Sequence, residues 1–206
     1  MKVVLTSVEQ DLTDAWKSIC GDLPGVDVHH GSIFAVECDA VVSPANSFGY
    51  MDGGIDLLYS LYFGWDVQDR LQNLIRTKHH GELVVGTADI VETGNPEILF
   101  LIAAPTMRVP MTLHNSINPY LAARAALLLA KHGRFSEGSR AGEPIADSVH
   151  IVAFPGLGTG VGQVTPELCA FQVRAAIEEV LLDKPAFPSS WREASLKHQK
   201  LIMGVR

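Results

Sequence analysis

Asn46 and Asp56 are ten positions apart, and the glycine pair Gly53-Gly54 stands shortly before Asp56. The apolar segment from Ala40 to Ser43 precedes this group and is typical of a buried strand. The amide of Asn46 can donate and accept hydrogen bonds, whereas the carboxylate of Asp56 can only accept them. A strand that leads through a flexible turn into a helix would hold these groups close together. The segment therefore predicts a ligand-binding loop with one carboxylate in the first turn of the following helix.

Both side chains also have a structural interpretation. Asn46 can form an Asx turn, in which the side chain binds the nearby backbone. A carboxylate such as Asp56 is stabilised at a helix N-terminus by the helix dipole, without any catalytic role. The residues alone leave both interpretations open.

A second segment, Ala153 to Gln163, carries glycines at alternate positions after an apolar strand. Glycine permits positive φ and close approach of the backbone, so successive N–H groups here can form a concave anion site. The helix predicted from Pro166, with Thr165 as its N-cap, follows this segment. The segment lacks the Lys of a Walker A loop and the spacing of a Rossmann fingerprint. A flexible surface loop is the remaining alternative to a phosphate-binding loop.

The rest of the chain indicates neither a metal site nor a disulfide framework. Cys20, Cys38 and Cys169 are far apart in sequence, which is typical of a reducing compartment. The pairs His29-His30 and His79-His80 lack the spacing of ligands on one helix face. Ser43 lacks the Gly-x-Ser-x-Gly context of a serine hydrolase. We expect no metal and no cofactor.

The composition excludes several classes of protein. The chain has 206 residues, 47% hydrophobic and 19% charged, which suits one globular domain or one domain with an appendage. Its net charge of −7 argues against an extended nucleic-acid-binding surface, because phosphate binding draws on clustered Lys and Arg. No apolar stretch is long enough to span a membrane. We expect a soluble, cytoplasmic protein.

Strand and helix patterns alternate along the chain, and the continuous apolar strands predict a sheet covered on both faces. The predicted strands are residues 2–7, 26–29, 40–43, 88–91, 98–103 and 148–154. The predicted helices are residues 9–20, 55–63, 67–79, 117–132 and 166–182, with a last helix over 191–203. Ligands of open α/β sheets bind outside the carboxyl ends of strands, so both loops are expected at one edge. We place one domain at residues 1–183 and a C-terminal tail, which could form a capping helix, at 184–206.

The two loops, in this order, resemble those of macrodomains, the ADP-ribose-binding family. The resemblance rests on Asn46 and Asp56, on Gly53-Gly54, and on Thr159-Gly160-Val161. It implies a three-layer α/β/α fold with a mixed central sheet. It also implies that Asn46 holds the distal ribose and that Asp56 orients the attacking water. The ligand-binding residues that it implies are Ser32, Ile33, Asn46, Gly53, Gly54, Gly158, Thr159, Gly160, Val161 and Gly162.

Two positions depart from the family pattern. Ser32 stands where many macrodomains have an Asp that accepts a hydrogen bond from the adenine amino group, so adenine recognition should be weaker or supplied by other groups. Gly162 replaces the aromatic residue common after the Thr-Gly-Val sequence. The resemblance implies hydrolysis of an ADP-ribosyl bond in an ADP-ribosylated substrate. The rival hypotheses are a non-catalytic module that binds ADP-ribose or a related nucleotide, and an assembly or interaction protein on the same scaffold.

Overall fold

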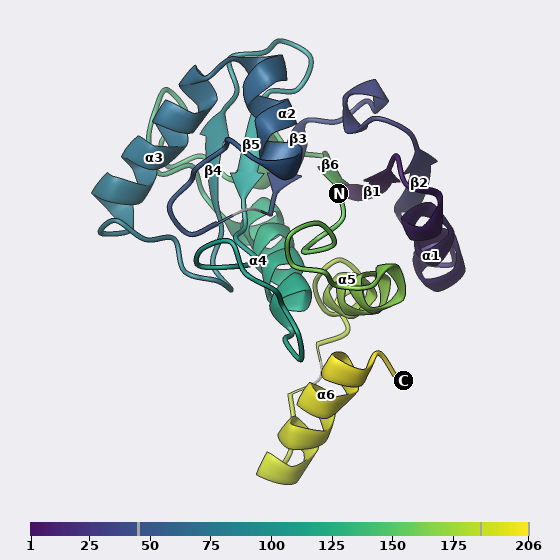
Figure 1. The fold of residues 1–206 in the computed structure, drawn as a ribbon. Helices are drawn as coiled ribbons and strands as arrows, with labels where there is room; N and C mark the ends of the chain where they lie inside the picture. Colours follow the sequence, from purple (N-terminus) through teal and green to yellow (C-terminus); the bar gives the residue numbers. More distant parts are fainter. Residues whose placement is uncertain (45, 186, 206) are drawn as a thin grey trace.

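In the computed structural model, which describes residues 1–44, 46–185 and 187–205, the strands form one sheet in the order β2-β1-β6-β3-β5-β4 (Figure 1). All neighbouring pairs are parallel except β4 with β5, so the sheet is mixed, as predicted. The strands are β1 (Lys2–Ser7), β2 (Val26–His30), β3 (Ala40–Ser43), β4 (Asp89–Glu92), β5 (Phe100–Ala103) and β6 (Ile151–Phe154).

Alternate residues of each strand point to opposite faces of the sheet, and both faces are covered. On one face, β-strand side chains such as Leu5, Val42 and Phe154 pack against α1, α4 and α5. On the other face, Val41, Leu101 and other side chains pack against α2 and α3. These helices are α1 (Gln10–Cys20), α2 (Gly54–Phe63), α3 (Asp66–Lys78), α4 (Asn118–His132) and α5 (Pro166–Val180). The result is the predicted three-layer α/β/α arrangement.

Local side-chain bonds shorten two of the predicted strands. The strand predicted from Ser148 begins at Ile151, because a short 3-10 helix, Ile145–Asp147, precedes it and Asp39 Oδ2 accepts from the N–H groups of His150 and Ile151 at 2.8 Å. The strand predicted from Ile98 begins at Phe100, because Asn95 Oδ1 accepts from the Ile98 N–H at 3.1 Å. The other predicted strands and helices have bounds within two residues of those observed.

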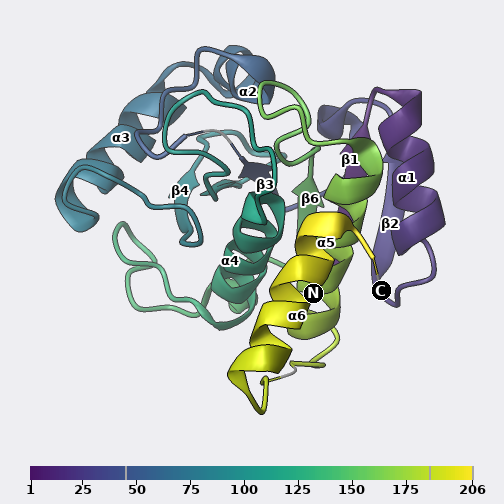
Figure 2. The same cartoon turned by 60° about the horizontal axis from the view of Figure 1, so that its bottom comes forward.

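The C-terminal tail forms helix α6 (Trp191–Met203), with the predicted bounds. The Ser190 hydroxyl caps it by accepting from the Glu193 N–H at 3.2 Å. Helix α6 lies along α5 (Figure 2), where Leu201 is 5% exposed and its carbonyl accepts from Gln172 Nε2 at 3.1 Å. Lys197 pairs with Glu179 of α5 at 2.6 Å. No helix among the described residues has the length and apolar character needed to cross a membrane.

We expect Leu201→Ala to loosen α6 from α5, because it removes the buried apolar side chain that joins them. The burial predicts a loss of about 2 kcal/mol in the local stability of α6. Amide hydrogen exchange of residues 191–203 measures this loss. Leu196→Ala is the matched control, since Leu196 is 56% exposed on the same helix. Equal exchange rates in the two variants would contradict the assigned packing of α6.

Candidate functional site

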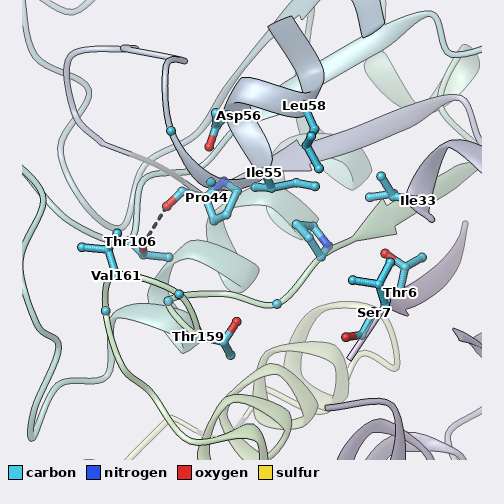
Figure 3. Close-up of a pocket in the computed structure, with 18 of the residues that line it drawn as sticks. Thr6, Ser7, Ile33, Pro44, Ile55, Asp56, Leu58, Thr106, Thr159 and Val161 are labelled. Atoms are coloured by element: carbon cyan, nitrogen blue, oxygen red, sulfur yellow. Dashed lines mark hydrogen bonds between the residues drawn. The ribbon is translucent and has the colours of Figure 1, made fainter. Parts of the chain in front are cut away.

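A cleft of about 380 Å³ opens at the edge where the parallel strands end (Figure 3). Its walls come from the segments that follow β1, β2, β3, β5 and β6. The structure brings every predicted site residue to this cleft. The lining includes Ser32, Ile33, Asn46, Gly53, Gly54, Asp56, Gly158, Thr159, Gly160, Val161 and Gly162.

The glycine-rich loop presents backbone N–H groups that the protein itself does not use. Among the described residues, no hydrogen bond has the N–H of residues 158 to 162 as its donor. The carbonyl groups of this loop are used instead: Gly158 O accepts from Val164 N at 3.0 Å, and Gly162 O accepts from Leu113 N at 2.8 Å. Because the carbonyls are bonded to the protein and successive N–H groups are not, the loop is suited to bind an anion.

Two of these glycines are required by the geometry of the loop, and one is not. Gly158 has φ +71°, a conformation that residues with a side chain rarely adopt. A Cβ atom at Gly162 would lie 2.4 Å from the Gly158 carbonyl oxygen. A Cβ atom at Gly160 would meet nothing within 4 Å. Gly160 is therefore the position where the site can be changed without disturbing the loop.

Asp56 is buried, with 2% of its surface exposed, yet it lines the cleft. It lies in the first turn of α2, and the Ser43 hydroxyl at the end of β3 donates a hydrogen bond to Oδ1. Burial raises the pKa of Asp56 from 3.8 to about 7, and the bonds from Ser43 and the Asp56 backbone offset only part of this effect. Near neutral pH, this carboxyl group can therefore both hold and release a proton.

The side chain of Asn46 forms hydrogen bonds with the backbone of its own loop. Its Oδ1 accepts from the N–H groups of Phe48 at 3.1 Å and Tyr50 at 3.3 Å, and its Nδ2 donates to the Tyr50 carbonyl at 2.8 Å. This is the Asx-turn role that the sequence left open. One N–H of the amide remains for a ligand. These two hydrogen bonds to the Tyr50 backbone keep an aromatic residue at the cleft: Tyr50 lines the cleft and is 57% exposed.

Contacts from two other loops brace the segment that follows Asn46. Ser47 N donates to the Arg108 carbonyl at 3.2 Å, and Ser47 O accepts from Leu83 N at 2.9 Å. Arg108 pairs with Glu82 at 2.8 Å, and its guanidinium lies 5.1 Å from the centre of the Phe48 ring. The Thr106 hydroxyl donates to the Pro44 carbonyl at 2.7 Å (Figure 3). The loop is thus positioned before any ligand binds.

The cleft is lined by carboxylates but not by basic side chains. Glu9, Asp52 and Asp56 line it, and none of its described lining residues is Lys, Arg or His. An anion would therefore be held by backbone N–H groups and the N-terminus of α2 rather than by a cation. Within the described residues, no cluster of His, Cys, Asp and Glu suits a metal ion.

Some residues that line the cleft were not predicted from the sequence: the segment from Thr6 to Glu9, Tyr50 and Thr106. A signal for the first group was present. Thr6 and Ser7 end the strand predicted over residues 2–7, and Val8 and Glu9 follow it. The rule that ligands bind beyond the carboxyl ends of strands therefore applies to this segment equally. Tyr50 and Thr106 carry no comparable signal, because their place depends on how the loops pack.

Comparisons with known proteins match this architecture. The family model described as Macro domain matches residues 42–173. An uncharacterized protein from Aquifex aeolicus is 32% identical over 160 residues, covering 78% of this chain and 83% of that protein.

Solved structures share the fold at low sequence identity. The macrodomain of Mycobacterium tuberculosis DarG has a TM-score of 0.58 at 18% identity, covering 73% of this chain and 88% of that chain. An Oceanobacillus iheyensis macrodomain with ADP has a TM-score of 0.59 at 19% identity, covering 83% of this chain and 86% of that chain. A point mutant of that macrodomain with ADPR has a TM-score of 0.57 at 16% identity, covering 97% of this chain and 91% of that chain.

We expect Asp56→Asn to stabilise the protein relative to wild type increasingly as the pH rises from about 4 to about 7. The pKa of Asp56 is higher in the folded protein than in the unfolded chain, so the neutral carboxyl group favours folding. This contribution to stability is complete below pH 3.8 and is lost as the pH rises through about 7. The full shift corresponds to about 4 kcal/mol. Urea unfolding at a series of pH values measures the difference. The exposed Asp52 provides the control, because Asp52→Asn removes no buried charge. A difference independent of pH would contradict the assigned burial.

Proposed function

The chain belongs to the Macro domain family, and we propose that its cleft binds ADP-ribose and hydrolyses an ADP-ribosyl bond. One observation carries the proposal: the unused N–H groups of residues 158 to 162 and the buried carboxyl of Asp56 line the same cleft. The first feature suits a diphosphate and the second suits a reaction beside it. A structural neighbour of this chain contains ADPR, which supports the choice of ligand.

The proposed binding mode assigns each part of the cleft to one part of ADP-ribose. The diphosphate lies on Gly158, Thr159, Gly160, Val161 and Gly162, whose N–H groups donate to its oxygens. The distal ribose lies between Asn46, Gly53 and Gly54, next to Asp56. This assignment is consistent with the loop geometry, because Gly53 and Gly54 leave open space where a side chain would otherwise stand.

The proposed reaction breaks the bond between the anomeric carbon of the distal ribose and its acceptor atom. The leaving group departs with the bonding electron pair, and positive charge develops on the ribose. Ionised Asp56 accepts a hydrogen bond from the attacking water and then its proton, while the water oxygen bonds to the anomeric carbon. Ser43 keeps the Asp56 carboxyl in one orientation through the hydrogen bond to Oδ1. The proton taken by Asp56 then passes through solvent to the departing acceptor atom, so the products are ADP-ribose and the free acceptor, and Asp56 is ionised again.

One observation favours the alternative, a binding module without catalysis. Both ends of the Asn46 amide already bind Phe48 and Tyr50, so only one of its N–H groups is free for a ribose hydroxyl. A weakly held distal ribose would allow binding but little turnover. Turnover measurements therefore decide between the two functions.

We expect wild-type protein to bind ADP-ribose and Gly160→Glu to lose this binding. A carboxylate beside the diphosphate adds repulsion and bulk, whereas the open space at Gly160 leaves the fold unchanged. Calorimetric titration measures the affinity, and saturating ligand should raise the melting temperature of wild type but not that of Gly160→Glu. Gly160→Ala is the control and should retain binding. Normal binding by Gly160→Glu would show that the loop does not hold the phosphates.

We expect turnover to rise with pH through about 7, because Asp56 must lose its proton before it can accept one from water. Asp56→Asn should lower turnover about 100-fold or more. Its affinity for ADP-ribose should stay within about tenfold, or ~1.4 kcal/mol, since the carboxylate acts mainly on the water. The assay is release of ADP-ribose from modified protein and modified nucleic acid.

Asp52→Asn serves as the matched control for this assay, because Asp52 is an exposed carboxylate of the same cleft. We expect it to keep the pH profile of wild type. Full turnover by Asp56→Asn would make Asp56 a structural carboxylate. Absence of turnover in wild type on every substrate, with binding intact, would favour the binding module.

A further inference from the structure

The end of the cleft away from Asp56 is formed by the last residues of β1 and by the segments that follow β1 and β2. Figure 3 shows Thr6, Ser7 and Ile33 on the side opposite Asp56 and Val161. If the diphosphate lies on the glycine loop and the distal ribose lies beside Asp56, the base of the nucleotide must lie at this other end. The placement of the base therefore rests on the proposed function.

Most polar side chains at this end are already engaged by the protein. The Thr6 hydroxyl donates to the Phe154 carbonyl at 3.2 Å, and the Ser7 hydroxyl donates to the Glu9 carbonyl at 3.1 Å. The Ser32 hydroxyl oxygen accepts from the Phe34 N–H at 3.3 Å and caps a short 3-10 helix, Ile33–Ala35. Each of these hydroxyl oxygens keeps a lone pair, but none carries a charge, so they offer a base only neutral hydrogen bonds.

Glu9 is the exception. It lines the cleft, it is exposed, and its side chain does not cap α1, although it occupies the N-cap position of that helix. Among the described residues, no hydrogen bond or ion pair to its carboxylate is found. A carboxylate with both oxygens free is a pure acceptor, and here it belongs to a residue that lines the cleft.

The backbone of Glu9 is held firmly, so the carboxylate starts from a fixed point. Its N–H donates to Ser7 Oγ at 2.9 Å, and its carbonyl accepts from Thr13 N at 3.1 Å and from Thr13 Oγ1 at 2.9 Å. The preceding residue, Val8, contacts His30 of β2 through its carbonyl at 3.3 Å. Because the backbone is fixed, less conformational entropy is lost when a bound ligand orders the Glu9 side chain.

We propose that Glu9 reads the base of the bound nucleotide, by accepting a hydrogen bond from an exocyclic amino group such as that of adenine. Carboxylates pair with exocyclic amino groups of bases in this way. Glu9 thereby supplies the negatively charged acceptor that Ser32 cannot. Hypoxanthine carries a keto oxygen in place of the adenine amino group, and that oxygen is repelled by a carboxylate. The cleft therefore selects ADP-ribose over inosine diphosphate ribose.

Calorimetric titration with ADP-ribose and with inosine diphosphate ribose tests this role. Wild type should bind ADP-ribose at least about tenfold more tightly, as expected for a hydrogen bond to a charged group. Glu9→Gln should lose most of this preference, because its amide can accept from adenine or donate to hypoxanthine. Asp11→Asn is the matched control: it removes an exposed charge from the same end of α1 without touching the cleft, and it should keep the wild-type preference.

The outcomes separate this inference from the proposed function. Equal affinities for the two ligands in wild type, or an unchanged preference in Glu9→Gln, would overturn the role of Glu9 and leave ADP-ribose binding established. A loss of preference in Asp11→Asn as large as that in Glu9→Gln would also overturn it, because long-range charge would then explain the effect. Wild type that binds neither ligand would overturn the proposed function itself, and the role of Glu9 with it.

Discussion

Strands β3 and β6 pair in parallel, and the chain leaves them toward opposite faces of the sheet. Ala40 pairs with Val152 and Val41 with Ala153, so the two strands end side by side. Beyond β3 the chain enters α2 on one face, and beyond β6 it enters α5 on the other. Two loops that diverge from neighbouring strands leave a crevice between them, which is where open α/β sheets bind ligands. The cleft, its glycine loop and the position of Asp56 all depend on this pairing.

Within that crevice the protein keeps a carboxyl group in surroundings that disfavour its charge. Burying Asp56 lowers stability whenever the group ionises, and one hydrogen bond from Ser43 offsets only part of that loss. A carboxylate at the surface would carry no such penalty. The burial is understandable if the group has to hold and release protons near neutral pH, because strongly shifted carboxyl groups are concentrated at reactive sites.

Periodicity predicted the order of strands and helices along the chain, and the rule that ligands bind beyond the carboxyl ends of strands predicted that the loops meet at one edge. The mixed sheet was implied only by the resemblance to macrodomains. Gly158 and Asp56 could be singled out because each lies in a segment that follows a buried strand, although a surface loop and a helix-end carboxylate stayed open as alternatives. The bond from Ser43 to Asp56, the hold of Asn46 on Tyr50, and the free carboxylate of Glu9 could not. Each depends on side-chain directions that are set only when the loops pack together.

The absence of basic side chains among the described lining residues of the cleft has a consequence for the solution behaviour of the protein. Proteins that bind nucleic-acid phosphates with Lys and Arg lose affinity steeply as salt is added, because each such contact releases a condensed counterion. Backbone N–H groups carry only partial charges and attract few ions of their own. The proposed binding of a diphosphate should consequently lose much less affinity with rising ionic strength than binding at a cationic site would.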